Sequence, residues 1–153
     1  MNTEQARIKH IFIADDDVDD CIFFEEALLE LNIPNELTIT NDGVGLMTKL
    51  NEIVTEAPPP DVIFIDLNMP RKNGYECLEE IRQNPRLKKI PVVIFSTTDN
   101  NEAVDKCYNQ GANYFVRKPN SHERLKKVIE TILMIDLWKQ SFKTPRNHFL
   151  LVE

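Results

Sequence analysis

Residues 62–70 read Val62-Ile63-Phe64-Ile65-Asp66-Leu67-Asn68-Met69-Pro70, four apolar residues followed by a turn that begins with an acid. A run that is apolar at every position, rather than at every second one, is typical of a strand covered on both faces, as in a parallel sheet. The sequence therefore predicts a buried parallel strand over residues 62–65, with Asp66 at its carboxyl end.

The same arrangement recurs along the chain, where short apolar runs alternate with longer segments of helical periodicity. Between the runs, apolar residues recur at spacings of three and four, as expected for one face of a helix. This alternation predicts an α/β fold, a (βα)5 doubly wound parallel five-stranded sheet with helices on both faces. The other four predicted strands are Ile11-Phe12-Ile13-Ala14, Leu37-Thr38-Ile39-Thr40, Val92-Val93-Ile94-Phe95 and Tyr114-Phe115-Val116.

The composition excludes several classes of protein. The 153 residues suffice for one domain, and a formal net charge of −7 argues against a nucleic-acid binder, which needs clustered Lys and Arg. The three cysteines lack the spacing of a disulfide framework or a zinc site. No run approaches the roughly 20 apolar residues of a membrane span. We therefore expect a cytoplasmic protein that binds neither nucleic acid nor membranes.

Polar side chains follow four of the five predicted strands. They are Asp15-Asp16, Asp66, Ser96-Thr97 and Lys118-Pro119. Ligands of such sheets bind beyond the carboxyl ends of the strands, so these side chains are expected at one edge. Crowded carboxylates repel one another unless a cation balances them, and Mg²⁺ prefers oxygen ligands of this kind. The pattern predicts a Mg²⁺ site that includes Asp16 and Asp66, whereas Asp17 is more typical of a helix N-cap.

These motifs, taken in order, resemble the CheY-like receiver domains of two-component response regulators. The resemblance covers about residues 8–135 and also includes Gly74 after the third strand. It implies a five-stranded sheet in the flavodoxin-like order 2-1-3-4-5. The acidic run from Asp15 to Asp20, together with a C-terminal extension, is similar to the stand-alone receivers associated with phytochrome-type kinases.

The resemblance implies a phosphorylation site at Asp66. This residue would accept a phosphoryl group from a sensor histidine kinase or phosphotransfer protein and form an acyl phosphate. Asp16, Asp66 and the backbone carbonyl of Asn68 would bind Mg²⁺, with Asp15 holding the ion through water. Lys118 would pair with the phosphoryl oxygens, and its bond to Pro119 would be cis.

A conformational switch is implied as well. Ser96 occupies the hydroxyl position of the family and Phe115 the aromatic switch position, although ordinary core packing is an alternative for Phe115. New phosphate charge would attract the Ser96 hydroxyl and the Lys118 ammonium, and the end of the fourth strand would move with them. Asn68 and Thr98 occupy positions on which the rate of dephosphorylation depends in this family.

Two alternatives compete with a phospho-accepting regulator. Phosphatases of the haloacid dehalogenase type use a second acid two residues after the nucleophile, but Asn68 stands there and cannot exchange a proton near neutral pH. A degenerate receiver that only binds partners is expected to lack the acidic pair, Asp66 or Lys118, all of which are present. We therefore expect no turnover enzyme, but self-catalysed phosphoryl transfer with slow autodephosphorylation at most.

The predicted receiver domain spans residues 1–138, and residues 139–153 form a C-terminal tail that is not a separate domain. The apolar end Phe149-Leu150-Leu151-Val152 favours disorder or packing on the chain's own surface, or else self-association, in a monomer or weak homodimer. No output domain is recognisable after residue 135, so output is expected through a downstream protein target. Its docking surface would include basic residues that suit an acidic partner or merely solubility, namely Lys106, Arg117, Arg124, Lys126 and Lys127.

Overall fold

The computed structural model describes residues 7–151 except residues 99, 141 and 142. Its strands form one parallel sheet in the order β2-β1-β3-β4-β5-β6. The strands are β1 (Lys9–Ala14), β2 (Asn35–Thr40), β3 (Val62–Ile65), β4 (Val92–Ser96), β5 (Tyr114–Arg117) and β6 (Leu150–Leu151). The first five confirm the predicted (βα)5 sheet and its order 2-1-3-4-5.

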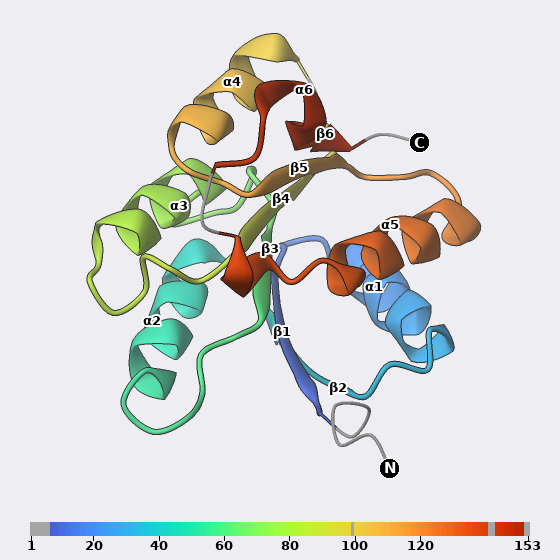
Figure 1. Cartoon of the computed structure of the whole chain (residues 1–153), viewed down its shortest axis with the longest axis horizontal. Coiled ribbons are helices and arrows are strands. Elements are labelled where there is room, and N and C mark those ends of the chain that lie inside the picture. Colours follow the sequence, from blue (N-terminus) through green and yellow to red (C-terminus); the bar gives the residue numbers. More distant parts are fainter. Residues whose placement is uncertain (1–6, 99, 141–142, 152–153) are drawn as a thin grey trace.

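Helices cover both faces of the sheet (Figure 1). They are α1 (Val18–Glu30), α2 (Gly43–Ile53), α3 (Gly74–Gln83), α4 (Asn101–Asn109), α5 (His122–Met134) and α6 (Arg146–Phe149), and a short 3-10 helix spans Leu137–Lys139. Helices α1 and α5 pack on one face, and α2, α3 and α4 pack on the other. Successive residues of β3 serve both cores, since Ile63 and Ile65 face α2–α4 while Val62 and Phe64 face α1 and α5. This explains why the strand is apolar at every position.

The sheet is one strand wider than predicted, because the C-terminal tail adds β6 to the edge of β5. Phe115 is paired with Leu150 in this parallel register. Phe149 is fully buried, with its ring centroid 5.0 Å from that of Tyr108 and 6.4 Å from that of Phe115. Of the alternatives for the tail, the described residues show packing on the chain's own surface, whereas Val152 lies outside them.

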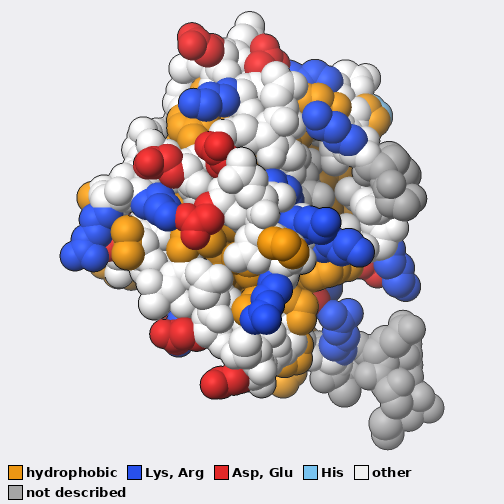
Figure 2. Space-filling model, turned by 90° about the vertical axis from the view of Figure 1, so that its left-hand side faces the viewer, with side chains coloured by type: hydrophobic (Ala, Val, Ile, Leu, Met, Phe, Trp, Pro, Cys, Tyr) orange, Lys and Arg blue, Asp and Glu red, His pale blue; other side chains and the backbone are white. Residues whose placement is uncertain are grey.

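The outer surface carries charges of both signs. Figure 2 views the side formed by α2, α3 and α4, where acidic and basic side chains are interspersed with apolar ones. Over residues 7–151, with the gaps given above, no helix is both long and apolar enough to cross a membrane.

Candidate functional site

Three carboxylates meet at the carboxyl edge of the sheet. Asp15 and Asp16 follow β1 and Asp66 follows β3, and one oxygen of each lies within 4.8 Å of the others. Asp15 and Asp66 are buried, whereas Asp16 is exposed. The structure therefore brings together the three acids predicted to form the metal site.

The parallel register explains this convergence. Ala14 of β1 is paired with Ile65 of β3, so the residues that follow them leave the sheet side by side. The backbone N–H of Asp66 donates to the Ala14 carbonyl at 2.9 Å and extends the ladder by one bond. The loop after Asp66 brings Gly74 back against the end of β3, so that a Cβ on Gly74 would lie 2.4 Å from the Asp66 carbonyl oxygen. Only glycine permits this close approach.

Lys118 reaches into the cluster from the end of β5. Its Nζ lies 2.8 Å from Asp15 Oδ2, 2.8 Å from Asp20 Oδ2 and 3.7 Å from Asp66 Oδ2. The contact with Asp20 has hydrogen-bond geometry. The contact with Asp15 is an ion pair that leaves Asp15 Oδ2 without a hydrogen bond to any described residue. The ammonium thus lies equally close to Asp15 and Asp20 and farther from Asp66.

Sequence reasoning missed Asp20 as a member of the site. The residue lies in the first turn of α1, 98 positions from Lys118, inside a run of acids whose outward and inward members look alike in sequence. A signal was available in the N-cap. Asp17 caps α1 as predicted, by accepting from the backbone N–H of Asp20 at 3.1 Å, and this fixes where Asp20 lies on the helix.

Burial and charge shift the titration of these groups. Burial raises the pKa of Asp66 to about 6, although the Lys118 charge opposes this effect. Burial also raises the pKa of Asp15. Burial alone would lower the pKa of Lys118, but its contacts with Asp15 and Asp20 and the charge of Asp66 outweigh that effect, and the pKa is raised. Lys118 is therefore a permanent cation, whereas Asp66 is held in an environment that resists its charged form.

The donor set fits a hard divalent cation. Asp15, Asp16 and Asp66 offer oxygen ligands, and the buried Asp15 Oδ2 has no hydrogen bond within the described part of the chain. The Lys118 ammonium lies against this oxygen but offsets only one negative charge, so the cluster keeps an excess that a divalent cation would compensate. Asn68 is exposed two residues after Asp66, and its carbonyl stays a predicted ligand.

Ser96 and Phe115 occupy neighbouring strands. Ser96 ends β4, is fully buried, and accepts at Oγ from the backbone N–H of Thr98 at 3.3 Å, while its carbonyl accepts from the Lys118 N–H at 2.8 Å. Phe115 is fully buried in β5, beside Ile94 of β4. Ser96 is thus hydrogen-bonded to the Lys118 backbone. Phe115 pairs with Ile94 of β4 on one side and with Leu150 of the tail on the other.

Asn68, two residues after Asp66, lines one pocket together with Thr98. The pocket has a volume of about 380 Å³ and is bounded on its far side by α4 residues that include Glu102 and Lys106. Lys106 Nζ lies 4.3 Å from the centroid of the Tyr75 ring, which also lines the pocket. The two positions predicted to tune dephosphorylation therefore face the same space.

The expectation of a cis bond before Pro119 is wrong, because the described residues contain no cis peptide bond. Trans is the more stable form of a bond to proline, by roughly 0.5–1 kcal/mol. With this trans bond the Lys118 side chain reaches all three carboxylates.

Comparisons with known proteins agree with this geometry. Residues 11–130 match the family model described as response regulator receiver domain. The response regulator Rcp1 of Synechocystis sp. is 35% identical over 134 residues, which cover 86% of this chain and 91% of Rcp1. A probable chemotaxis protein CheY of Rhizobium etli is 30% identical over 80% of this chain and 90% of its own.

Two solved structures are similar over most of the chain. The phosphorylated cyanobacterial phytochrome response regulator RcpA has a TM-score of 0.78 and 31% identity, and the match covers 90% of this chain and all of RcpA (100%). The Mn²⁺-bound form of Rcp1 has a TM-score of 0.74 and 34% identity over 90% of this chain and 99% of that one.

Proposed function

The chain belongs to the response regulator receiver domain family of two-component signalling, and from this premise we propose that it accepts a phosphoryl group on Asp66. The observation that carries the proposal is the placement of Asp66. It is buried at the carboxyl end of β3, beside two further carboxylates and 3.7 Å from the Lys118 ammonium. The relative RcpA is phosphorylated in its solved structure, which supports the same chemistry here.

The donor is a phosphohistidine of a histidine kinase or phosphotransfer protein, the partners with which receiver domains interact. A carboxylate oxygen of Asp66 attacks the phosphorus atom, the phosphorus–nitrogen bond breaks, and the imidazole leaves with its electron pair and takes up a proton. The product is an acyl phosphate on Asp66. Lys118 lies where it can neutralise negative charge on the phosphoryl oxygens.

Mg²⁺ is the cation proposed for the site. Asp16 and Asp66 would bind it directly, with Asp15 acting through water and the Asn68 carbonyl as a further ligand. When bound, the ion would balance the charge of the carboxylates and of the incoming phosphoryl group. The Mn²⁺-bound structure of Rcp1 supports a divalent ion of this kind.

The phosphoryl group is proposed to switch the conformation around β4 and β5. Two charge-assisted hydrogen bonds, from Ser96 and Lys118, are together worth about 3–6 kcal/mol. Inverting a 1:99 equilibrium takes about 5.5 kcal/mol, so the available energy suffices for a substantial shift. Phe115 would transmit the change, because its ring faces Phe149 of the tail.

The downstream partner is proposed to dock near α4 and α5 rather than on the outer edge of β5. Leu150 and Leu151 pair with β5 and so cover that edge. Lys126, one of the basic residues assigned to docking, lies 3.3 Å from Glu30 on α1 and 3.6 Å from Glu123. Part of the basic charge of this surface is therefore already balanced within the chain.

Labelling with acetyl phosphate and Mg²⁺, followed by intact-mass measurement, tests the proposal. The wild-type protein is expected to gain one phosphoryl group that is labile to acid and base. Asp66→Asn is expected to gain none, whereas Asp19→Asn, which removes an exposed aspartate of α1, should label like the wild type. A phosphoryl group on a serine would overturn the assignment.

We also propose that the chain is not a turnover phosphatase. Asn68 stands where such an enzyme would need a second acid, and it has no proton to exchange near neutral pH. Incubation with a phosphomonoester should therefore release no more phosphate from the wild type than from Asp66→Asn. Sustained turnover that is lost in this variant would favour the enzyme instead.

A further inference from the structure

The Lys118 ammonium is hydrogen-bonded to Asp20, an acid to which the proposed phosphoryl transfer assigns no role; this contact is called the tether below. The Lys118 Nζ donates a hydrogen bond to Asp20 Oδ2 at 2.8 Å. Asp20 is itself fixed, because its backbone N–H donates to the Asp17 side chain at the start of α1. The Asp20 side chain is 29% exposed to solvent, so it lies at the rim of the cluster and not in the core.

Asp15 and Asp20 both lie 2.8 Å from the ammonium but constrain it differently. A lysine side chain is flexible and its ammonium has three donors, so a single ion pair does not fix their direction. The close contact with Asp15 lacks hydrogen-bond geometry, whereas the contact with Asp20 has it. At 3.7 Å, Asp66 is too far for a direct hydrogen bond but close enough for a phosphoryl oxygen on it to come within reach.

We propose that Asp20 is a positioning residue for phosphoryl transfer, which holds the Lys118 ammonium at the rim so that a free N–H remains for the oxygens of the group arriving on Asp66. The inference rests on the proposed function of Asp66. It assigns Asp20 no contact with the phosphoryl group, since its effect passes through Lys118. Preorganised donors contribute to catalysis because they need no rearrangement as charge develops.

A purely electrostatic role for Asp20 predicts the opposite sign. Removing one negative charge near the acceptor would attract an anionic donor more strongly and speed labelling. Removing a tether would leave Lys118 less well placed and slow it. Asp19 provides the matched control, because it is an exposed aspartate in the same turn and removing it changes the charge equally.

The first readout needs neither metal nor phosphate. In metal-free protein, the Lys118 ammonium is observed by nitrogen–proton correlation NMR, where a hydrogen-bonded ammonium gives a protected signal. We expect this signal in the wild type and in Asp19→Asn, and its loss or a shift toward free lysine in Asp20→Asn. An unchanged signal in Asp20→Asn would overturn the tether.

The second readout is the rate of labelling by acetyl phosphate, with Mg²⁺ saturating for each variant. In Asp20→Asn we expect the rate at saturating donor to fall about three- to tenfold, the equivalent of losing one partly exposed charge-assisted hydrogen bond. The donor concentration for half-maximal rate should not rise. Asp20→Glu retains a carboxylate and should recover part of the rate, and Asp19→Asn should match the wild type.

The two proposals fail in distinguishable ways. If the wild-type protein is not labelled on Asp66, the proposed function is wrong, while the NMR signal of Lys118 still decides whether Asp20 holds the ammonium. If the wild type is labelled but Asp20→Asn is labelled as fast as Asp19→Asn or faster, the positioning role is wrong and Asp66 keeps its assignment.

Discussion

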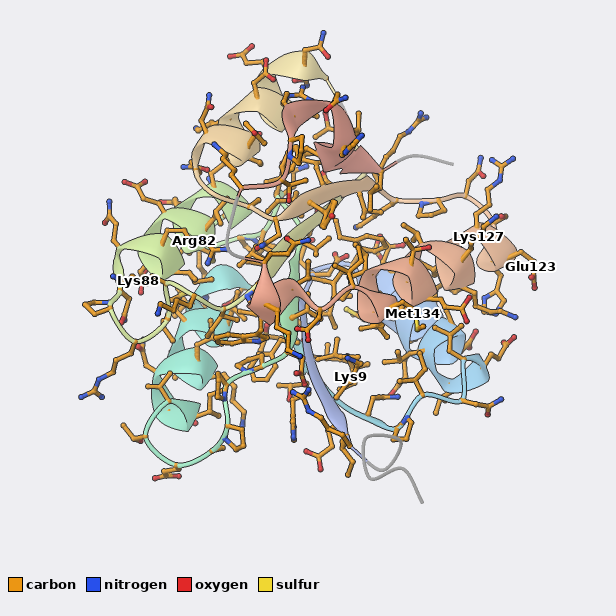
Figure 3. The ribbon with its side chains drawn as sticks, viewed as in Figure 1. Lys9, Arg82, Lys88, Glu123, Lys127 and Met134 are labelled. Atoms are coloured by element: carbon orange, nitrogen blue, oxygen red, sulfur yellow. The ribbon has the colours of Figure 1, made fainter. Side chains whose placement is uncertain are left out.

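Two partly buried cations lie at opposite edges of the sheet and have opposite kinds of partner. Lys118, at the carboxyl edge, has three carboxylates within 3.7 Å. Arg82, labelled on α3 in Figure 3, lies at the edge where β4 and β5 begin. Its guanidinium donates to the carbonyl oxygens of Lys88, Ile90 and Gly111 and to the side-chain oxygen of Asn113, at 2.7–3.0 Å.

The two cations differ in what their contacts do: those of Arg82 stabilise the fold, whereas those of Lys118 belong to the candidate functional site. The acceptors of Arg82 are neutral and belong to fixed backbone or to a short side chain. Burial lowers the pKa of Arg82 to about 10, so the group is still charged at neutral pH. Lys118 is outnumbered by acids, two of which have raised pKa values because of burial. At the Arg82 edge, the hydrogen bonds of the cation are satisfied within the protein. The Lys118 edge retains an excess of negative charge that suits a metal and phosphoryl transfer.

The largest effect on stability is expected from Arg82→Met. Removing the guanidinium deprives two partly buried carbonyl oxygens, those of Ile90 and Gly111, and the partly buried Asn113 side chain of their donor, and we expect the free energy of unfolding to fall by about 3 kcal/mol. Urea denaturation measures the change. Arg86→Met is the control, because this arginine is exposed on the same side of the molecule and its loss should change stability by less than about 0.5 kcal/mol.

The loss in Arg82→Met should not depend on Mg²⁺, because the metal site lies at the other edge of the sheet. Folded Arg82→Met should still be labelled on Asp66 by acetyl phosphate. If added Mg²⁺ restored its stability, the two edges would be coupled, and Arg82 would not act on stability alone.

A smaller and opposite effect is expected from Asp66→Asn in metal-free protein. The folded protein holds the pKa of Asp66 at about 6, above the value of about 3.8 expected in the unfolded chain. The folded state therefore binds more protons between these values, and wild-type stability is lost as the pH rises through about 6. Asn cannot ionise, so we expect Asp66→Asn to be more stable than the wild type by about 2 kcal/mol at pH 7.

The pH dependence gives this prediction its sign. The advantage of Asp66→Asn should shrink as the pH falls from 7 through about 6 and vanish below about 3.8, where the wild-type carboxyl is protonated in both states. Saturating Mg²⁺ should also shrink it, because the ion stabilises the charged form of the wild type. Thermal unfolding at several pH values measures both trends, and an advantage that grew on acidification would contradict the raised pKa.

The same two edges show what the sequence could reveal. Asp15, Asp16, Asp66, Ser96 and Lys118 follow buried strands, and a parallel sheet brings such positions to one edge whatever the helices between them contain. The partners of Arg82 are mainly backbone carbonyls, which every residue carries, so no sequence pattern marks them.

Two further features were hidden for related reasons. The predicted Asp17 N-cap places Asp20 on α1, but its pairing with Lys118 also depends on how α1 is rotated against the end of β5, which the run of acids does not specify. Strand β6 comprises two residues, Leu150 and Leu151, and is too short to show a periodicity. In each case the contact is decided by tertiary packing and not by local sequence.

The smallest effect tests whether Lys118 competes with the metal for the same carboxylates. In Lys118→Met the ammonium no longer neutralises Asp15 and Asp66, so the cluster gains one net negative charge while most of the side-chain volume remains. We expect Mg²⁺ to bind about tenfold more tightly, equivalent to about 1.4 kcal/mol, as measured by titration calorimetry. Arg82→Met removes the same charge from the opposite edge and should leave the affinity within about twofold of the wild type, because solvent ions screen distant charges. Equal gains in both variants would mean that net charge alone governs the affinity, whereas a gain confined to Lys118→Met would show that the lysine and the metal act on the same two acids, Asp15 and Asp66.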